Sequence, residues 1–238
     1  MRSLWNVDTR SGPAHDRRPG GFPPGDVLAH RGMWSETVGG NTAGALLDAV
    51  AKGLGVETDI RDRNREIIIS HDPGAGSSLL LENFLGSVPA KSEFPGLVAL
   101  NVKADGLVPL LTDELGGVHS LGTVRHFFFD MSIPETLKYL AAGLPVALRV
   151  SEYEQVDTSL RGKSQLSVRL WVDCFESDWF IGDGTLLGLL ELHSVTLVSP
   201  EIHGRDPRWA WDWVHKLRQQ GLDVSICTDT PLEFLRWS

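Results

Sequence analysis

Three short motifs hold most of the residues that could do chemistry: His30-Arg31-Gly32, Glu57-Thr58-Asp59 and Ser70-His71-Asp72. An unperturbed imidazole titrates at about pH 6.5, so histidine transfers protons near neutrality. Carboxylate oxygens are the preferred ligands of hard divalent cations, and arginine neutralises negative charge that grows in a reaction. These residue types therefore indicate acid–base chemistry at an anionic centre, assisted by a metal ion.

Glu57 and Asp59 are two positions apart in a segment typical of a β-strand. Their side chains would share one face of the strand, about 6.5 Å apart along it. Two carboxylates this close repel each other unless a cation neutralises them, so we expect a Mg²⁺ or Ca²⁺ ion there. The alternative is a solvated strand, or one whose acids pair with the nearby Arg61, Arg63 and Arg65.

The next apolar segment, 66–71 (EIIISH), follows that strand too closely for a parallel crossover, which needs about a dozen residues. An antiparallel hairpin is therefore expected. If its turn is centred on Asn64, His71 lies opposite Glu57, and directly opposed residues point to the same face. His30, at the end of the adjacent strand, can reach the same space. One histidine would deprotonate the attacking hydroxyl, and the other would protonate the leaving oxygen.

Zinc ligation by the two histidines is the main chemical alternative. It ranks lower because no third His or Cys lies at a spacing typical of zinc sites. Cys174 and Cys227 lie in separate apolar runs, outside any CxxC pattern, and are expected to be buried free thiols.

Apolar strand-like runs alternate with helix-like segments from Asp26 to the end of the chain. Nearly continuous apolar runs are typical of parallel strands that are buried on both faces. Eight such strands with crossover helices predict an α/β fold, a single-domain (β/α)₈ TIM barrel over 26–238. A β-hairpin extension follows strand 2, and an irregular arm covers 1–25. An open Rossmann-type sheet is disfavoured because no Gly-rich loop follows the first strand.

In a TIM barrel the chemistry takes place at the C-terminal ends of the strands. Asn101 and Lys103 fall at the end of the third predicted strand, and Arg149 lies on the fifth. Arg31, Lys103 and Arg149 are the candidate phosphate-binding cations. The first helix is expected over 41–52, with Asn41 as its N-cap. Further polar residues expected at the mouth are Asp130, Asp173, Glu201, His203 and Asp229.

The motifs LAHRG (28–32), VETDIR (56–61), ISHD (69–72) and LNVK (100–103), with the Asn41-Thr42 pair, resemble the glycerophosphodiester phosphodiesterase family. That family belongs to the barrel superfamily that also holds phosphatidylinositol-specific phospholipases C. The resemblance covers residues 27–103, and the remainder matches only as barrel strands. It implies a metal-dependent phosphoric diester hydrolase. His30 and His71 would be its catalytic pair, Glu57 and Asp59 metal ligands, and Arg31 and Lys103 phosphate ligands.

The chain departs from the family pattern at two positions. Members typically carry a glutamate as third metal ligand two residues before the lysine, where this chain has Asn101. An amide oxygen can ligate a hard cation but brings no charge. The glutamate usual just before the Asn-Thr pair is replaced by Gly40.

The formal net charge of −9, without any Lys/Arg run, argues against a nucleic-acid partner. An anionic small-molecule substrate would then need a local positive site, such as a metal ion. No apolar run reaches the length of about 18 residues that a membrane span needs. No apolar leader is visible at the N-terminus, so we expect a cytoplasmic protein without stable membrane association.

The leading hypothesis is a divalent-metal-dependent hydrolase of a glycerophosphodiester-like small molecule. A cyclic phosphate would form if the attacking hydroxyl belonged to the substrate. A phospholipase D-like or sugar-phosphodiester enzyme of the same superfamily is one alternative. A non-catalytic barrel that binds a phosphorylated ligand is another, and Asn101 is its main support.

Overall fold

Eight parallel strands form a nearly closed barrel in the computed structural model, which describes residues 21–73, 79–112, 118–155, 168–181, 184–190 and 193–237. The pairing order is β5-β4-β2-β1-β9-β8-β7-β6, and a single parallel bridge between Phe128 and Val146 joins β5 to β6. The predicted (β/α)₈ barrel is confirmed. Its strands are β1 (Val27–His30), β2 (Gly55–Arg63), β4 (Leu97–Val102), β5 (Arg125–Phe129), β6 (Ala147–Val150), β7 (Arg169–Val172), β8 (Val195–Val198) and β9 (Val224–Thr228).

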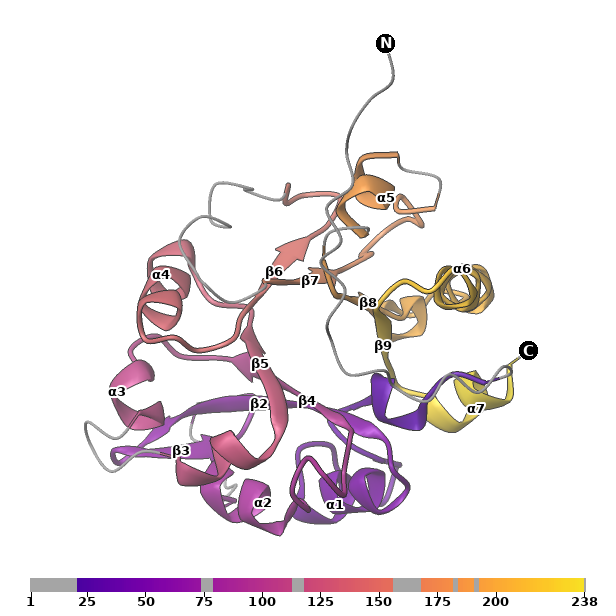
Figure 1. Ribbon diagram of the computed structural model, residues 1–238. Helices are drawn as coiled ribbons and strands as arrows, with labels where there is room; N and C mark the ends of the chain where they lie inside the picture. The colour runs from indigo at the N-terminus through magenta and orange to yellow at the C-terminus, as the bar shows by residue number, and fades with distance from the viewer. Residues whose placement is uncertain are drawn as a thin grey trace.

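Helices surround the strands on the outside, as the view in Figure 1 shows. They are α1 (Ala43–Ala51), α2 (Leu81–Ser87), α3 (Val108–Leu111), α4 (Ile133–Ala141), α5 (Gly184–Leu190), α6 (Arg208–Gln219) and α7 (Pro231–Arg236), with short 3-10 turns η1 (Pro24–Asp26), η3 (His119–Thr123) and η5 (Pro200–His203). Apolar residues on the outer face of the barrel pack against them in one large core. None of the helices described is long and apolar enough to cross a bilayer. Of the predicted arm, 1–20 lies outside the described residues.

The interior of the barrel is apolar in its middle layer. Phe129 stacks on Trp171 there, with ring centroids 3.9 Å apart. Because side chains on a strand alternate between two faces, the inward residue two positions later lies one layer nearer the C-terminal mouth. That step leads from an apolar residue to a polar one on five strands: Leu28 to His30, Ala99 to Asn101, Ala147 to Arg149, Trp171 to Asp173 and Cys227 to Asp229.

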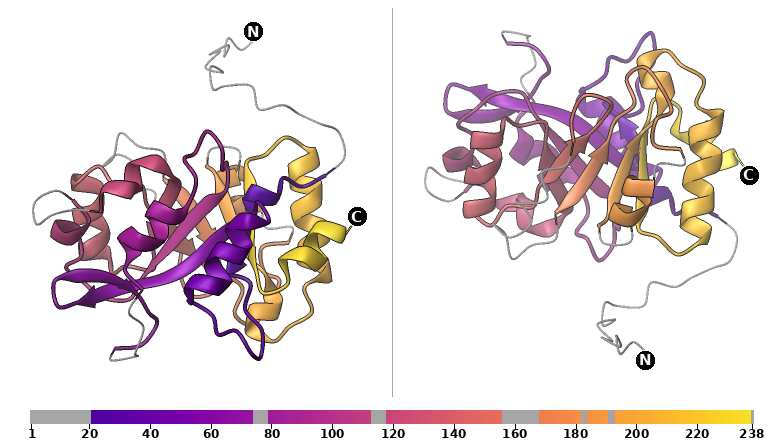
Figure 2. Two further views of the ribbon diagram at one scale, coloured as in Figure 1. Left: turned by 90° about the horizontal axis from the view of Figure 1, so that it is seen from below. Right: turned by 90° about the horizontal axis from the view of Figure 1, so that it is seen from above.

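The predicted hairpin is present, but its predicted register was wrong by one residue. β3 (Glu66–Ile69) pairs antiparallel with β2, so that Ile60 faces Ile69. The turn consists of Asn64 and Arg65, which both have positive φ (53° and 68°), as a two-residue type I′ turn requires. A two-residue turn has no central residue, so extending the ladder would place His71 opposite Thr58 rather than Glu57. In the side views of Figure 2 the hairpin reaches out beyond the barrel.

Candidate active site

His30 ends β1 and is held by a carboxylate from the end of β9. Its Nδ1 lies 2.8 Å from Oδ1 of Asp229, which also accepts a hydrogen bond from Trp34 Nε1 at 3.1 Å. An ionised carboxylate can only accept, so Nδ1 carries the proton and Nε2 keeps its lone pair. Nε2 lies 3.9 Å from Oε2 of Glu57. Asp229 therefore fixes the tautomer that lets His30 act as a base.

The ionisation of His30 and Glu57 is shifted by their surroundings. Burial lowers the pKa of His30, but its hydrogen bond to Asp229 and the charges of Glu57 and Asp229 outweigh that effect, so the pKa is raised above its ordinary value. Burial also raises the pKa of Glu57, against the opposing effect of the nearby His30. The charge state of each group therefore influences that of the other.

Asp59 is fully buried and binds three side chains. Its Oδ2 lies 3.1 Å from Arg31 Nε and accepts a hydrogen bond of 2.7 Å from Asn41 Nδ2, while its Oδ1 lies 3.5 Å from Lys103 Nζ. Arg31 also donates its backbone N–H to Glu57 Oε2 at 3.2 Å. The structure therefore brings Arg31, Lys103 and both predicted acidic ligands into one cluster with His30.

Asn41 belongs to this cluster and is not the N-cap of α1, which corrects the prediction from the sequence. Thr42 caps the helix, because its Oγ1 accepts from Ala45 N at 3.3 Å. Asn41 has a φ of 60°, a left-handed conformation that asparagine tolerates better than most residues. Its Oδ1 accepts from Thr58 Oγ1 and from Asp59 N at 2.7 and 3.2 Å. Asn41 thus orients the carboxylate of Asp59.

The ion pairs continue around the mouth with alternating sign. Lys103 Nζ lies 3.1 Å from Oδ2 of Asp130, whose other oxygen pairs with Arg149. Arg149 Nε lies 4.0 Å from Oδ2 of Asp173. His203 Nε2 then lies 2.7 Å from Oδ1 of Asp173. Seven side chains from consecutive strands thus form one chain of contacts: Arg31, Asp59, Lys103, Asp130, Arg149, Asp173 and His203.

The oxygen ligands predicted for a metal ion fit one by donor type. Asp59 and Asn101 are register partners on β2 and β4, and Oδ1 of each is buried without a hydrogen-bond partner among the described residues. Adjacent oxygens without a hydrogen bond are suited to a hard cation, which here would compete with Lys103 Nζ, 3.5 Å from Oδ1 of Asp59; Glu57 lies on the same strand as Asp59. No three His, Cys, Asp or Glu side chains in the described part of the chain could hold a metal together. The ligand set would therefore be two carboxylates and one amide.

Among the ion pairs of the described residues, none joins an arginine of the hairpin to Glu57 or Asp59, so the Arg-paired form of the alternative is wrong. Arg61 donates instead to two carbonyl oxygens, those of His71 and Lys103, both at 3.0 Å. This guanidinium ties the hairpin to the end of β4. The cations that pair with Asp59 are therefore Arg31 and Lys103.

His71 is brought to the mouth by its backbone, but its imidazole lies at the open edge. The side chain is 45% exposed, and Nδ1 lies 2.7 Å from Oδ1 of Asp72. Within the described residues it makes no ion pair with Glu57, as the corrected register explains. Its catalytic role therefore stays a prediction.

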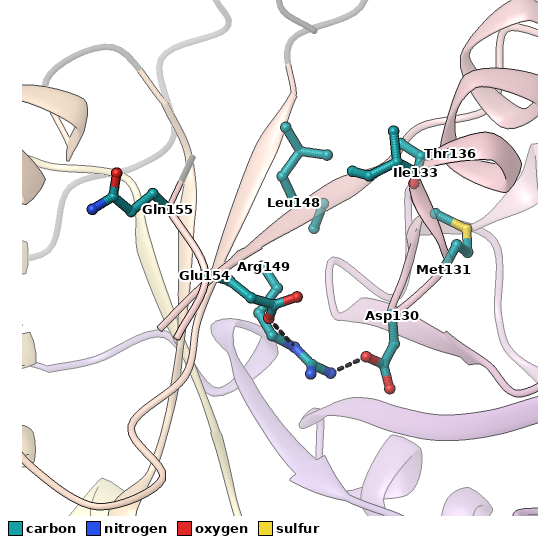
Figure 3. A pocket seen from close by; sticks show the side chains of 9 residues that line it. Asp130, Met131, Ile133, Thr136, Leu148, Arg149, Glu154 and Gln155 are labelled. Carbon is teal, nitrogen blue, oxygen red and sulfur yellow. Dashed lines mark hydrogen bonds and ion pairs between the residues drawn. The ribbon is translucent and has the colours of Figure 1, made fainter. Parts of the chain in front are cut away.

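The side of the mouth formed by β6, β7 and β8 is more elaborate than the sequence indicated. Asp173 and His203 were expected at the mouth, yet their pairing was not foreseen. A cavity of about 220 Å³ lies beside Arg149, lined from the end of β5, from α4, and from β6 and the loop after it; Figure 3 shows Arg149 between Asp130 and Glu154. The residues that line the cavity are Asp130, Met131, Ile133, Thr136, Ala147, Leu148, Arg149, Glu154 and Gln155.

Two solved structures share this arrangement of strands and helices. A glycerophosphoryl diester phosphodiesterase from Parabacteroides distasonis aligns with a TM-score of 0.60 at 13% identity, over 88% of this chain and 84% of its own. The glycerophosphodiester phosphodiesterase of Thermotoga maritima aligns with a TM-score of 0.54 at 17% identity, over 87% and 96%. This chain has the glycerophosphodiester phosphodiesterase fold. No protein-family model and no curated protein sequence matches it.

The resemblance seen in residues 27–103 is thereby confirmed at the level of the fold. The glycerophosphodiesterase fold extends over the later strands as well, because the aligned part covers 88% of the chain. The two neighbours show the fold only, and the roles of individual residues follow from the contacts described above for this chain.

Proposed function

We propose that this protein is a divalent-metal-dependent phosphodiester hydrolase that acts on a glycerophosphodiester-like small molecule. The observation that carries the proposal is the position of His30. Its imidazole lies between Asp229 and Glu57, beside the cluster of Arg31, Asp59 and Lys103. Phosphodiester cleavage needs a general base to activate the attacking hydroxyl and positive charge to stabilise the phosphoryl oxygens, and this arrangement offers both.

His30 supplies the first proton transfer. Its Nε2 takes the proton from the attacking hydroxyl, of water or of the substrate itself, and Asp229 stabilises the imidazolium that results. If the hydroxyl belongs to the substrate, the first product is a cyclic phosphate. We assign the second transfer, to the leaving oxygen, to His71, whose backbone is tied beside Lys103 through Arg61.

Arg31 and Lys103 are the nearest cations for the phosphate, and Arg149 lies further along the same chain of ion pairs. Their charges neutralise the negative charge that grows on the phosphoryl oxygens in the transition state. A divalent ion held by Glu57, Asp59 and Asn101 would supply Lewis-acid polarisation of a phosphoryl oxygen. The buried Oδ1 of Asn101, which has no hydrogen-bond partner among the described residues, supports this assignment, and so does Oδ1 of Asp59, whose contact with Lys103 Nζ is an ion pair at 3.5 Å and not a hydrogen bond.

The test is a hydrolysis assay with the purified protein. Bis(p-nitrophenyl) phosphate and a set of glycerophosphodiesters are incubated with it in Mg²⁺, Ca²⁺ or Mn²⁺, and again with excess EDTA. We expect hydrolysis that requires the metal. The proposal is refuted if none of these diesters is cleaved under any of the metal conditions.

A barrel that binds a phosphorylated ligand without turnover is the second candidate, and Asn101 favours it. With an amide at this position the two carboxylates face the charges of Arg31 and Lys103, which weakens their attraction for a cation. Calorimetric titration with a phosphodiester separates the two functions. Binding without product, and of equal strength in His30→Ala, would favour the binding barrel.

A further inference from the structure

Asp229 lies one residue beyond β9, where the regular ladder to β8 has ended. The last bond of this ladder runs from Ser199 N to the carbonyl of Cys227, at 2.8 Å. The next bond of a parallel ladder would run from Asp229 N to the carbonyl of Ser199. That carbonyl instead accepts from Ile202 N at 3.1 Å, because the chain turns into η5 at Pro200. The backbone N–H of Asp229 therefore needs an acceptor from elsewhere.

Glu201 supplies that acceptor from the 3-10 turn after β8. Its Oε1 accepts the backbone N–H of Asp229 at 3.1 Å and also the hydroxyl of Thr228. Oγ1 of Thr228 in turn accepts the backbone N–H of Thr230 at 3.1 Å. The backbone N–H groups of Asp229 and of the residue after it are thus held by a single carboxylate, the first directly and the second through Thr228.

The carboxylate of Glu201 is itself anchored in the core. Its Oε2 accepts from the hydroxyl of Ser199, and Oγ of Ser199 accepts from the buried Trp211 Nε1 at 2.8 Å. Trp211 belongs to α6 and packs edge-on against Phe234 of α7, with ring centroids 5.6 Å apart. Figure 1 shows these two helices outside β8 and β9. A continuous series of hydrogen bonds therefore leads from the outer helices to the backbone of Asp229.

We propose that Glu201 is a positioning residue for the catalytic base: it holds the end of β9 so that the carboxylate of Asp229 meets Nδ1 of His30. This inference rests on the proposed function, in which His30 is the base. No hydrogen bond or ion pair among the described residues joins Glu201 to His30, so Glu201 acts through Asp229.

The contact between Asp229 and His30 tolerates little movement. A hydrogen bond of 2.8 Å that lengthens by about 1 Å is lost. Trp34, the other partner of the Asp229 carboxylate, is 44% exposed and lies on the loop after β1, so it is a weak anchor. Loss of the bonds from Glu201 should therefore free Asp229 and allow His30 to adopt either tautomer.

The tautomer of His30 tests the proposal without any substrate. It is read from the imidazole nitrogen NMR chemical shifts of the full chain, at a pH at which the ring is neutral, and His30→Gln identifies the signals. The wild type should carry the proton on Nδ1. Glu201→Ala should carry it on Nε2 in a large fraction of the molecules. Glu201→Gln should resemble the wild type, because its amide oxygen still accepts from Asp229 N.

The two substitutions separate position from charge, because both remove the negative charge of Glu201. An equal change of tautomer in Glu201→Ala and Glu201→Gln, or no change in either, would overturn the inference. The matched control is Glu93→Ala, the same exchange at an exposed position before β4, which should leave the tautomer unchanged.

Thr228→Val takes the place of Glu201→Ala if that variant does not fold. It keeps Glu201 and its charge but removes the hydroxyl that links Glu201 to Thr230 N. The tautomer of His30 should change in the same direction, and an unchanged tautomer in this variant would overturn the inference.

Kinetics with bis(p-nitrophenyl) phosphate adds a second measurement. Glu201→Ala should lower kcat by roughly 10- to 100-fold with little change in KM, because the cations proposed for the phosphate keep their positions. Glu201→Gln should restore most of kcat. A higher KM without loss of kcat would overturn the inference. Absence of hydrolysis by the wild type refutes only the proposed function, and the tautomer measurement then decides the inference by itself.

Discussion

Nδ1 of His30 and Oδ1 of Asp229 lie 2.8 Å apart, and they join the end of β1 to the end of β9 across 199 residues of sequence. This contact gives His30 its tautomer and its raised pKa. It is the relationship on which the proposed proton transfer depends, because a histidine with Nε2 protonated could not accept a proton there.

Asp229→Asn should therefore reduce kcat for phosphodiester hydrolysis by roughly 10²- to 10⁴-fold. The amide can donate to Nδ1 and so favour the opposite tautomer, while the fold is kept. The measurement is kcat with thermal unfolding as a check on folding. Trp34→Phe removes only the second hydrogen bond to Asp229 and should cost much less. Equal losses in both variants would argue against control of the tautomer.

Asn101→Asp should strengthen the binding of Mg²⁺ or Mn²⁺ by roughly tenfold, because it adds a third negative ligand beside Asp59. Isothermal titration with the metal alone measures the effect. Asn83→Asp, the same exchange at an exposed position of α2, is the control and should not change it. The assignment of the cation to this position fails if both variants bind metal as the wild type does.

The side chain of Asn41 donates a hydrogen bond to Asp59, and its backbone adopts the left-handed conformation. Asn41→Gly and Asn41→Ala should both lower hydrolysis, since each removes the bonds to Asp59 and Thr58. The free energy of unfolding should fall by a further ~1 kcal/mol in the alanine variant only, because a residue with a Cβ is strained at this φ. Urea unfolding of the two variants measures the difference. Full activity in the glycine variant would contradict the role of the side chain.

His71 should matter most when the leaving alcohol needs a proton. His71→Ala is expected to slow hydrolysis of alkyl diesters by roughly 10²-fold, and hydrolysis of p-nitrophenyl diesters much less, because p-nitrophenolate leaves without protonation. Comparing kcat for the two leaving groups decides the matter. A similar loss with both would remove His71 from the proton-donor role.

The surroundings of His215 should make the free energy of unfolding depend on pH, and this residue lies outside the candidate active site. Its ring stacks on Phe234, with centroids 4.8 Å apart, and burial lowers the pKa of His215. The unfolded chain then binds the proton first, so stability is lost as the pH falls below about 6.5 and is unaffected above it. Between about pH 7.5 and pH 5.5, His215→Phe should lose less stability than the wild type in urea unfolding. Identical losses would contradict the assignment.

The barrel could be predicted from the sequence because strand-like and helix-like segments alternate regularly along the chain. Alternating apolar runs and helices predicted eight parallel strands, and the alternation of side chains placed His30, Asn101 and Arg149 at the mouth. The register of the hairpin was missed because Arg65 has positive φ, which residue type alone does not indicate. Asn41 was interpreted as a helix cap because capping and ligand support favour the same residue type.

The pairing of Asp173 with His203 could not be predicted for a different reason. It joins two loops whose positions depend on the bonds of Glu152 and Arg205, and no local pattern encodes such contacts. Asp229 was expected at the mouth, but that it binds His30 follows only from the pairing of β1 with β9.

The most direct test compares wild type, His30→Gln and His126→Gln in the hydrolysis of bis(p-nitrophenyl) phosphate with Mn²⁺. We predict release of p-nitrophenolate by the wild type and by His126→Gln, its loss with EDTA, and a decrease of at least about 100-fold in His30→Gln. No release above buffer by the wild type, or an equal rate in His30→Gln, would contradict the account.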